Sequence, residues 1–248
     1  MKMNIKNLVL YIFTVLLLEL YSSFCLATPS TTYWSPCVAD IQPYGIFHFG
    51  VDNYTTIRKK GPSASGGQSF PTDFGIIVGI IPSEKIKMEV GIDILEPSDY
   101  PLFFNAKVGT SENILFDNSP AFNIGLFNIG TQKDVTDYDI LDFIAGKTLP
   151  FNLGRIHIAY YIGSNTLKDS SGNVDNKGFM LGYDKYIYED KIMFAADYAS
   201  GKNAVGGYGF GLYYFFTTNI SLLVGPVWFN DSGINGDMKW TTQLDINL

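Results

Sequence analysis

The stretch Gly206–Phe229 reads GGYGFGLYYFFTTNISLLVGPVWF and carries no charged residue. Its length of about 24 residues would suffice for a transmembrane helix, which needs roughly 20 apolar residues. However, large apolar residues alternate with glycine along its first half, and Thr217-Thr218-Asn219 interrupts it. A period of two indicates a β-strand rather than a helix. We therefore predict a hairpin of two strands, in which Pro226 marks an irregularity because proline donates no ladder hydrogen bond.

The same alternation recurs along the chain. In Lys85–Leu95 (KIKMEVGIDIL), five aliphatic residues fall on one face, opposite Lys87, Glu89, Gly91 and Asp93. Similar segments are Asn105–Gly109, Arg155–Gly163, Lys191–Ser200 and Lys239–Leu248, and weaker ones are Ile41–Val51, Phe74–Ile81, Ala121–Ile129, Tyr138–Lys147 and Gly178–Tyr186. In Tyr138–Lys147 the inward face is ambiguous, because Leu141 and Phe143 compete with Ile140 and Ile144. With the hairpin, this predicts an all-β chain of about twelve strands.

The connections between these segments alternate in length. Short, turn-like connections such as Glu189-Asp190 and Thr217-Thr218-Asn219 contrast with longer polar ones such as Arg58–Thr72 and Ser164–Lys177. Two connections depart from this pattern. Glu96–Tyr100 is short although it falls at the position of a long connection, and Thr110–Pro120 is long although it falls at the position of a short one. An antiparallel up-and-down barrel of an outer membrane has this asymmetry between its two ends.

A soluble barrel or sandwich would also alternate, so the second face of each strand has to be weighed. Glycine and alanine outnumber charged residues on that face, as at Gly207, Gly209 and Ala195, whereas a soluble surface would carry charge. Four aromatic residues share the apolar parity near segment ends and are expected at the membrane interface: Tyr208, Phe216, Trp228 and Trp240. In hydrocarbon a closed barrel satisfies every backbone polar group. The pattern predicts a transmembrane antiparallel up-and-down β-barrel.

The N-terminus has the parts of a secretory signal peptide. Lys2 and Lys6 precede the apolar run Leu8–Leu18, and small residues suit cleavage after Ala27, so residues 1–27 are expected to be removed. An uncleaved anchor helix is the alternative. Residues 28–40 would then form a periplasmic tail or a small plug, with the tail preferred, and residues 41–248 the barrel. Cys37 would be the only remaining cysteine, which excludes an internal disulfide.

Together, the signal peptide, the even strand number and the alternating terminal strand resemble those of bacterial outer-membrane β-barrel proteins. The resemblance covers Ile41–Leu248. It implies export to the bacterial outer membrane, with the lipid bilayer as one partner. The terminal WTTQLDINL is similar to the C-terminal signal read by the outer-membrane assembly machinery, which is the second implied partner, although it ends at Leu248 rather than at an aromatic residue.

Other classes of function have little support in the sequence. The net charge of −7 argues against a nucleic-acid partner. Outer-membrane phospholipases of twelve strands carry a His-x-Ser-Asn-Gly-like motif, but His48 and His157 are followed by Phe-Gly and Ile-Ala, so no catalytic residue is assigned. No cluster of His, Cys, Asp and Glu has ligand spacing, and no metal or other cofactor is expected.

The charged residues on the inward parity are the candidates for function. They are expected to line the lumen, where charge must be hydrated or paired: Lys87, Glu89, Asp93, Lys107, Arg155, His157, Asp184, Asp197, Lys239 and Asp245. The leading hypothesis is a porin-like channel that passes small solutes through a narrow polar lumen. The alternative is a non-conducting structural or adhesion barrel that presents surface loops, and an outer-membrane lipid hydrolase comes third.

Overall fold

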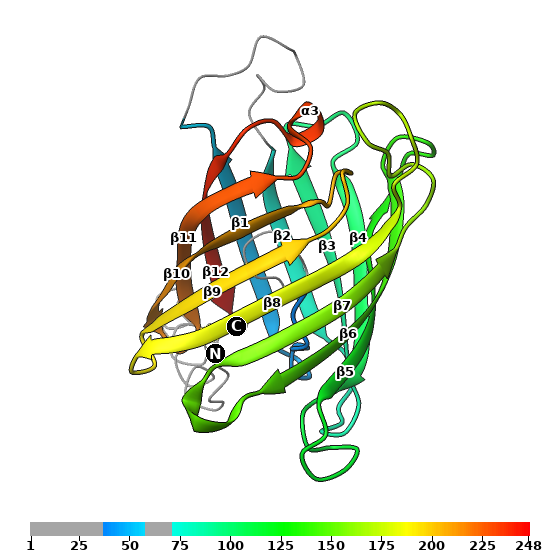
Figure 1. Ribbon diagram of the computed structural model, residues 1–248. Coiled ribbons are helices and arrows are strands. Elements are labelled where there is room, and N and C mark those ends of the chain that lie inside the picture. Colours follow the sequence, from blue (N-terminus) through cyan, green and yellow to red (C-terminus); the bar gives the residue numbers. More distant parts are fainter. Residues whose placement is uncertain (1–36, 58–70) are drawn as a thin grey trace, which may run out of the picture.

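The computed structural model describes residues 37–57 and 71–248, and these form a closed barrel of twelve antiparallel strands (Figure 1). Each strand pairs with its neighbours in the chain, and β1 closes the ring by pairing with β12. The strands are β1 Phe47–Thr55, β2 Thr72–Gly79, β3 Lys87–Glu96, β4 Leu102–Thr110, β5 Ala121–Gly130, β6 Asp137–Thr148, β7 Arg155–Ile162, β8 Lys177–Tyr188, β9 Ile192–Ala199, β10 Gly207–Thr217, β11 Ile220–Phe229 and β12 Lys239–Asn247. The predicted fold class is confirmed.

The predicted hairpin corresponds to β10 and β11, which meet at the turn formed by residues 218 and 219. The β10–β11 ladder is interrupted between the pairs Gly209↔Val227 and Leu212↔Val224, where Pro226 lies, and Pro226 pairs with Trp240 of β12. Proline tolerates such a position because the ladder on one side needs no N–H donor there. Among the residues that the structure describes, no helix is long and apolar enough to cross a membrane.

The two ends of the barrel differ, and we call them the turn end and the loop end. The turn end holds the start of β1 at Phe47 and the last residue Leu248, whose backbone groups hydrogen bond to each other. It also carries the β6–β7 connection with the 3₁₀ helix η1 Pro150–Asn152 and the short β8–β9 and β10–β11 turns. The loop end carries the β7–β8, β9–β10 and β11–β12 connections, with the four-residue helix α3 Ser232–Asn235 at the top of Figure 1. In outer-membrane barrels, the end with the shorter turns usually faces the periplasm.

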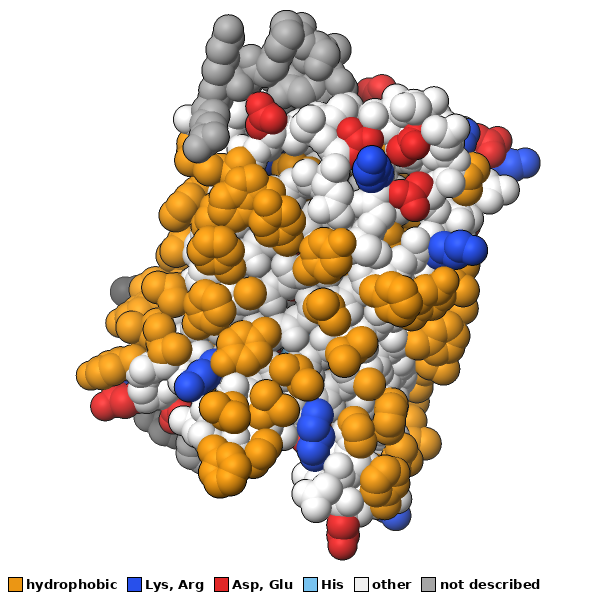
Figure 2. Space-filling view, viewed as in Figure 1, with side chains coloured by type: hydrophobic (Ala, Val, Ile, Leu, Met, Phe, Trp, Pro, Cys, Tyr) orange, Lys and Arg blue, Asp and Glu red, His pale blue; other side chains and the backbone are white. Residues whose placement is uncertain are grey.

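The outer wall is apolar, as the strand parity predicted. Phe210, Leu212 and Tyr214 of β10 are all more than 40% exposed, whereas Gly209, Tyr213 and Phe215 between and beside them are buried. Figure 2 shows hydrophobic side chains spread over the strand wall, with most of the acidic side chains near the two ends. Exposed apolar surface on this scale is unsuited to water and suits the hydrocarbon of a bilayer.

Part of the lumen is filled by apolar side chains. One cluster joins β9, β10 and β11 through Met193, Tyr213, Phe215, Leu223 and Val227. A second cluster surrounds Ile140, Ile144, Tyr161 and Met180. The inward face of β6 is therefore the one that carries Ile140 and Ile144, while Phe143 is 45% exposed on the outside. Side chains therefore fill part of the cross-section of the lumen.

The first strand is shorter at its N-terminal side than the pattern predicted. We expected a strand over Ile41–Val51, but β1 begins at Phe47. Ile41 and Gln42 are buried, and residues 37–43 lie among inward-facing side chains of other strands. We call residues 37–43 the strap. Its apolar residues resemble a strand in sequence because they are buried, not because they pair in the barrel wall.

Candidate functional site

All ten charged residues that the sequence placed on the inward parity lie on the inner face of their strands. Glu89, Lys107, His157, Asp184, Asp197, Lys239 and Asp245 are buried, and Lys87, Asp93 and Arg155 are partly buried. The structure does not bring them together as one site. Glu89, Lys107, Arg155, His157 and Asp184 gather around the strap, whereas Lys239 donates a hydrogen bond to Thr56 at the loop end and Asp245 pairs with His48.

On one side, β3 and β4 hold the strap by a charged pair. The ammonium group of Lys107 lies 3.4 Å from the Glu89 carboxylate and donates to the backbone carbonyls of Val38 and Asp40, at 3.2 and 3.1 Å. The Glu89 carboxylate accepts a hydrogen bond from the backbone N–H of Gln42, at 2.6 Å. Because hydrogen bonds to charged groups are worth more than neutral ones, this pair fixes the middle of the strap.

Elsewhere on the wall, β7 and β8 hold the strap through a second charged network. The Arg155 guanidinium lies 2.8 Å from the Asp40 carboxylate and 2.9 Å from that of Asp184. His157 Nε2 lies 3.1 Å from Asp184, and His157 Nδ1 accepts the backbone N–H of Ala39, also at 3.1 Å. Since Nδ1 is the acceptor, the proton of a neutral imidazole is on Nε2, where it can be donated to Asp184.

Three glycines of the wall make room for the strap. A Cβ atom on Gly79 would lie 2.1 Å from the carbonyl oxygen of Pro43, and one on Gly182 would lie 2.5 Å from that of Cys37. A Cβ atom on Gly146 would meet the side chain of Ala39 at 2.5 Å. Because real Cβ atoms do not approach backbone this closely, only glycine allows the strap to lie against these strands.

The strap crosses the lumen from wall to wall. Tyr44, just after the strap, forms a bridge with Gly79 of β2, while Cys37 lies against Gly182 of β8. In a ring of twelve strands, β2 and β8 are six positions apart and therefore lie opposite each other.

Two cavities line up on either side of the strap. The larger, about 650 Å³, extends to the loop end and is lined mainly by β1 to β6. The smaller, about 120 Å³, lies at the turn end beside Asp40, Lys87, Glu112 and Arg155. At its edge, burial alone would raise the pKa of Glu112, but hydrogen bonds from Thr148 and Lys147 outweigh it and hold that pKa below its usual value. The strap lines the smaller cavity through Ala39, Asp40, Ile41 and Pro43 and bonds to Glu89 and Lys107 at the edge of the larger one, so it lies between the two cavities.

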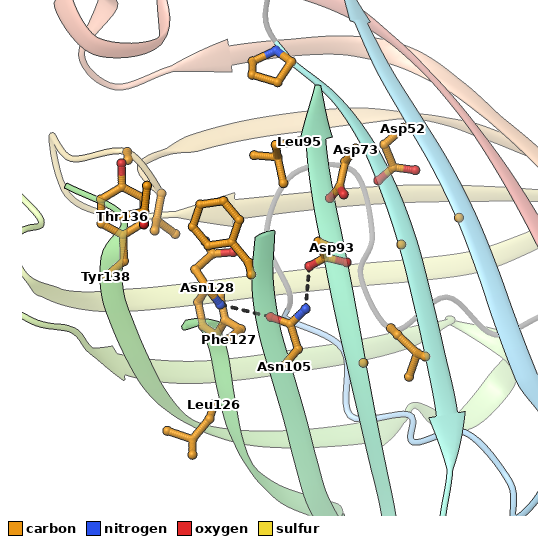
Figure 3. Close-up of a pocket in the computed structure, with 18 of the residues that line it drawn as sticks. Asp52, Asp73, Asp93, Leu95, Asn105, Leu126, Phe127, Asn128, Thr136 and Tyr138 are labelled. Atoms are coloured by element: carbon orange, nitrogen blue, oxygen red, sulfur yellow. Dashed lines mark hydrogen bonds between the residues drawn. The ribbon is translucent and has the colours of Figure 1, made fainter. Parts of the chain in front are cut away.

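The larger cavity is strongly acidic. Seven carboxylates line it, against one lysine in the described part of the chain: Asp52, Asp73, Glu89, Asp93, Asp99, Asp142 and Asp245, with Lys107. Lys107 pairs with Glu89, and His48 lies 3.4 Å from Asp245. In Figure 3, Asp52, Asp73 and Asp93 point into the cavity from three adjacent strands.

The sequence reasoning missed several residues of this cavity. Asp73 shares its parity with the inward Ile77, and Asp52 shares its parity with His48, so the alternation could have placed both. Asp142 was missed because β6 is apolar on both faces, and no local pattern distinguishes them. His48 was compared only with a phospholipase motif that it does not fit and was not placed in the lumen, yet it lies inside the barrel and bonds to Asn247.

The four predicted interface aromatics all point outward. Tyr208, Phe216 and Trp240 are exposed, and Trp228 stacks between Tyr208 and Phe210 at centroid distances of 5.4 and 5.7 Å. Tyr208, Trp228 and Trp240 lie near the loop end of their strands, and Phe216 lies near the turn end. Their positions suit the two interfaces of a bilayer, where such residues are enriched.

Both histidines hydrogen bond to groups of the barrel interior. His157 bonds to Asp184 and to the backbone amide of Ala39, and His48 bonds to Asp245 and Asn247. Within residues 37–57 and 71–248, no three His, Cys, Asp or Glu side chains are grouped so that they could hold a metal ion.

Comparison with known proteins identifies the fold. No family model matches the chain, and no curated protein matches its sequence. Among solved structures, the KdgM porin matches with a TM-score of 0.51 at 7% identity, covering 81% of this chain and 98% of that one. The NanC porin (TM-score 0.49, 11% identity) covers 81% and 98%, and an outer-membrane channel from Pseudomonas putida F1 (TM-score 0.45, 12% identity) covers 87% and 99%. The chain therefore has the barrel fold seen in bacterial outer-membrane porins.

Proposed function

We propose that this protein is an outer-membrane channel that passes small solutes through its lumen. The observation that carries the proposal is the acidic cavity of about 650 Å³, which occupies the lumen from the strap to the loop end. Barrels of eight strands are filled by side chains, and those of sixteen or more leave an aqueous channel, so twelve strands suit a narrow pore. The ten inward charged residues, from Lys87 to Asp245, would set its electrostatic preference.

The strap would act as a small plug in this channel. It is held at both walls by charged groups, and it separates the two cavities. A solute that travels the length of the lumen must therefore pass where the strap lies. We propose that conduction requires the strap to move, and that residues 37–40, the described part of the predicted tail or plug 28–40, act as a plug. Residues 28–36 lie outside the described part of the chain.

A non-conducting barrel is the second candidate, and the same strap favours it. The strap packs against Gly79, Gly146 and Gly182 of the wall. If it keeps the turn end closed, the barrel could serve as an anchor for its surface loops. Of the two loops expected to carry such a role, Ser164–Lys177 is described, and residues 58–70 of Arg58–Thr72 lie outside the described residues.

Location and assembly belong to the same proposal. The exposed apolar wall and the porin fold support insertion in a bacterial outer membrane, after export with removal of residues 1–27. Residues 1–36 lie outside the described part of the chain. The strand β12, which closes the barrel against β1, would be the segment that the assembly machinery reads.

The experiment is single-channel recording in a planar bilayer, with the purified protein and with Gly182→Ala. The added methyl group would meet the carbonyl of Cys37 and displace the strap, so we expect more frequent or larger openings in the variant. Gly50→Ala is the matched control, because a Cβ atom there meets its nearest neighbour at 3.7 Å, an ordinary contact. Silence from both the wild type and Gly182→Ala, with heat-dependent gel mobility showing folded barrels, would leave the non-conducting barrel as the function.

A further inference from the structure

The large luminal cavity has two chemically different sides. Carboxylates of β1, β2 and β3 stand on one side, and rings from the β3–β4 connection, β4, β5 and β6 stand on the other (Figure 3). The rings are Tyr100, Phe103, Phe127 and Tyr138, and those of Phe103 and Tyr138 stack at a centroid distance of 6.4 Å. A pocket of this kind combines a large apolar surface with a few charged groups that orient a ligand.

The carboxylates are arranged so that they repel one another. Asp52 and Asp73 face each other directly in the β1–β2 ladder, and Asp93 lies opposite Gly75, two residues along β2 from Asp73. Like charges directly opposite in a ladder destabilise a sheet. Among the described residues that line the cavity there is one lysine, Lys107, and no arginine. Lys107 pairs with Glu89 rather than with any of these three aspartates. A positive charge in the cavity would relieve this repulsion.

Hydrogen bonds hold one of these carboxylates in place. The Asn105 side-chain N–H donates to Asp93, and the Asn105 carbonyl oxygen accepts the backbone N–H of Asn128 at 3.0 Å. Both bonds are drawn in Figure 3. The absence of a side chain at Gly75 leaves room for the Asp93 carboxylate, because a Cβ atom there would lie 3.0 Å from Asp93 Oδ1. The group is thus oriented before any ligand arrives.

A second observation independently points to a ligand that carries a hydrogen-bond donor. Asp142 of β6 lines the same cavity, is 1% exposed, and its Oδ1 atom has no hydrogen-bond partner among the described residues. A buried carboxylate oxygen without a donor is costly, so it is a site where a donor from a ligand would be favoured. Asp142 stands on the ring-lined side, which places acceptors on two walls of the cavity.

We propose that this cavity binds organic cations, in which an ammonium group is joined to an apolar body. The ammonium group would lie near the carboxylates of Asp52, Asp73 and Asp93, and the apolar body would lie against Phe103, Phe127 and Tyr138, whose ring faces also attract cations. A simple metal ion fits less well, because the described residues offer no cluster of three metal-ligating side chains. The proposal names a substrate class for the channel, but binding does not require the barrel to conduct.

The test is calorimetric titration of the detergent-solubilised protein with three probes of one carbon skeleton. These are phenethylamine (cationic), 2-phenylethanol (neutral) and phenylacetate (anionic). We expect the amine to bind roughly tenfold or more tightly than the alcohol, because an attractive charge contact adds this much, and the anion not to bind. Equal binding of all three, or binding of none, would overturn the inference.

Variants locate the binding. The triple substitution Asp52→Asn, Asp73→Asn and Asp93→Asn keeps the side-chain shapes and should weaken amine binding about tenfold or more. The matched control Glu84→Gln, Asp117→Asn and Asp190→Asn makes the same change in net charge at exposed turn-end positions outside the cavity and should leave binding unchanged. Heat-dependent gel mobility verifies that each variant is folded. An equal loss of binding in both triple variants would contradict the proposed site.

Two further outcomes separate this inference from neighbouring ones. If calcium chloride binds, the triple variant abolishes that binding, and phenethylamine does not bind, the carboxylates serve a metal ion and the inference is wrong. Amine binding without conductance in the bilayer experiment would contradict the channel and leave the binding site standing. Conductance with no amine binding would contradict the binding site alone.

Discussion

The Nδ1 atom of His157 accepts a hydrogen bond from the backbone N–H of Ala39, 118 residues earlier in the chain. This contact joins the inner wall of β7 to the strap. Because the same ring donates through Nε2 toward Asp184, the strap, His157, Asp184 and Arg155 form one network at the turn end of the lumen. The network makes the strap an integral part of the barrel interior.

Weakening this network should loosen the strap without unfolding the barrel. Asp40→Asn removes the charge that pairs with Arg155, and Arg155 keeps its contact with Asp184. Because the Arg155–Asp40 pair is about one quarter exposed, we expect a stability loss of only about 1 kcal/mol or less. Bilayer recordings should show more openings than in the wild type. Asp190→Asn, at the exposed β8–β9 turn, should leave the recordings unchanged.

Cys37 offers a direct measure of strap release. Its side chain is fully buried, so a maleimide reagent should label it slowly in the folded wild type. Gly182→Ala should speed labelling of Cys37, as measured by mass spectrometry of the Cys37 peptide, because its methyl group competes with the Cys37 carbonyl for space. Gly50→Ala should label like the wild type. Equal labelling rates in all three proteins would show that the position of the strap does not depend on the space that Gly182 leaves.

Removing one partner of the buried pair Glu89–Lys107 should be costly. Both side chains are less than 10% exposed, and Lys107→Met would leave the Glu89 charge buried without its lysine partner, although the Gln42 N–H still donates to it. We expect a loss of about 3–5 kcal/mol in the free energy of unfolding, measured by urea titration in lipid vesicles. The double variant Lys107→Met with Glu89→Gln should recover part of the loss, since no unpaired charge remains. A double variant as unstable as the single one would argue against this explanation.

Charge on the outer wall should be penalised according to depth. Leu212 lies at the middle of β10 and faces outward, whereas Ile220 begins β11 at the turn. Leu212→Arg should destabilise the folded barrel by about 2–4 kcal/mol, and Ile220→Arg by about 0–1 kcal/mol, because the cost falls toward the membrane interface. The same urea titration measures both. Equal costs at the two positions would contradict the assignment of this wall to lipid.

A pH-dependent link joins two connections at the loop end. The backbone N–H of Ser170 donates to Asp231 at 3.0 Å, and Asp231 also caps α3 through Gly233. Hydrogen bonds from Ser170, followed by those from Gly233, hold the pKa of the Asp231 carboxyl below its usual value. A carboxyl whose pKa is lowered in the folded state stabilises that state at neutral pH, and the effect is lost as the pH falls through the lowered pKa. Protection of the Ser170 amide from hydrogen exchange, corrected for the intrinsic rate, should fall in acid, and Asp231→Asn should remove this pH dependence.

How far the sequence could be interpreted differs between strands. In β10, glycine alternates with large apolar residues, so the period of two assigns lipid and lumen faces without ambiguity. In β6, apolar residues stand on both faces, because the lumen there contains the cluster around Ile140 and Ile144. Local alternation cannot resolve such a strand, and Asp142 was missed for this reason. The parity that places Asp73 was present in the sequence, whereas its opposition to Asp52 appears only in the register between β1 and β2.

The alternation of side chains by itself determined that this chain forms a barrel of about twelve strands with an apolar outer wall, because a period of two is a local property that each strand carries alone. Only the tertiary structure decided what lies inside. The strap is bound by residues 47 to 118 positions away, and the acidic wall depends on strand register. Such contacts leave no local period, since they are made when the barrel closes and brings distant segments within hydrogen-bonding distance.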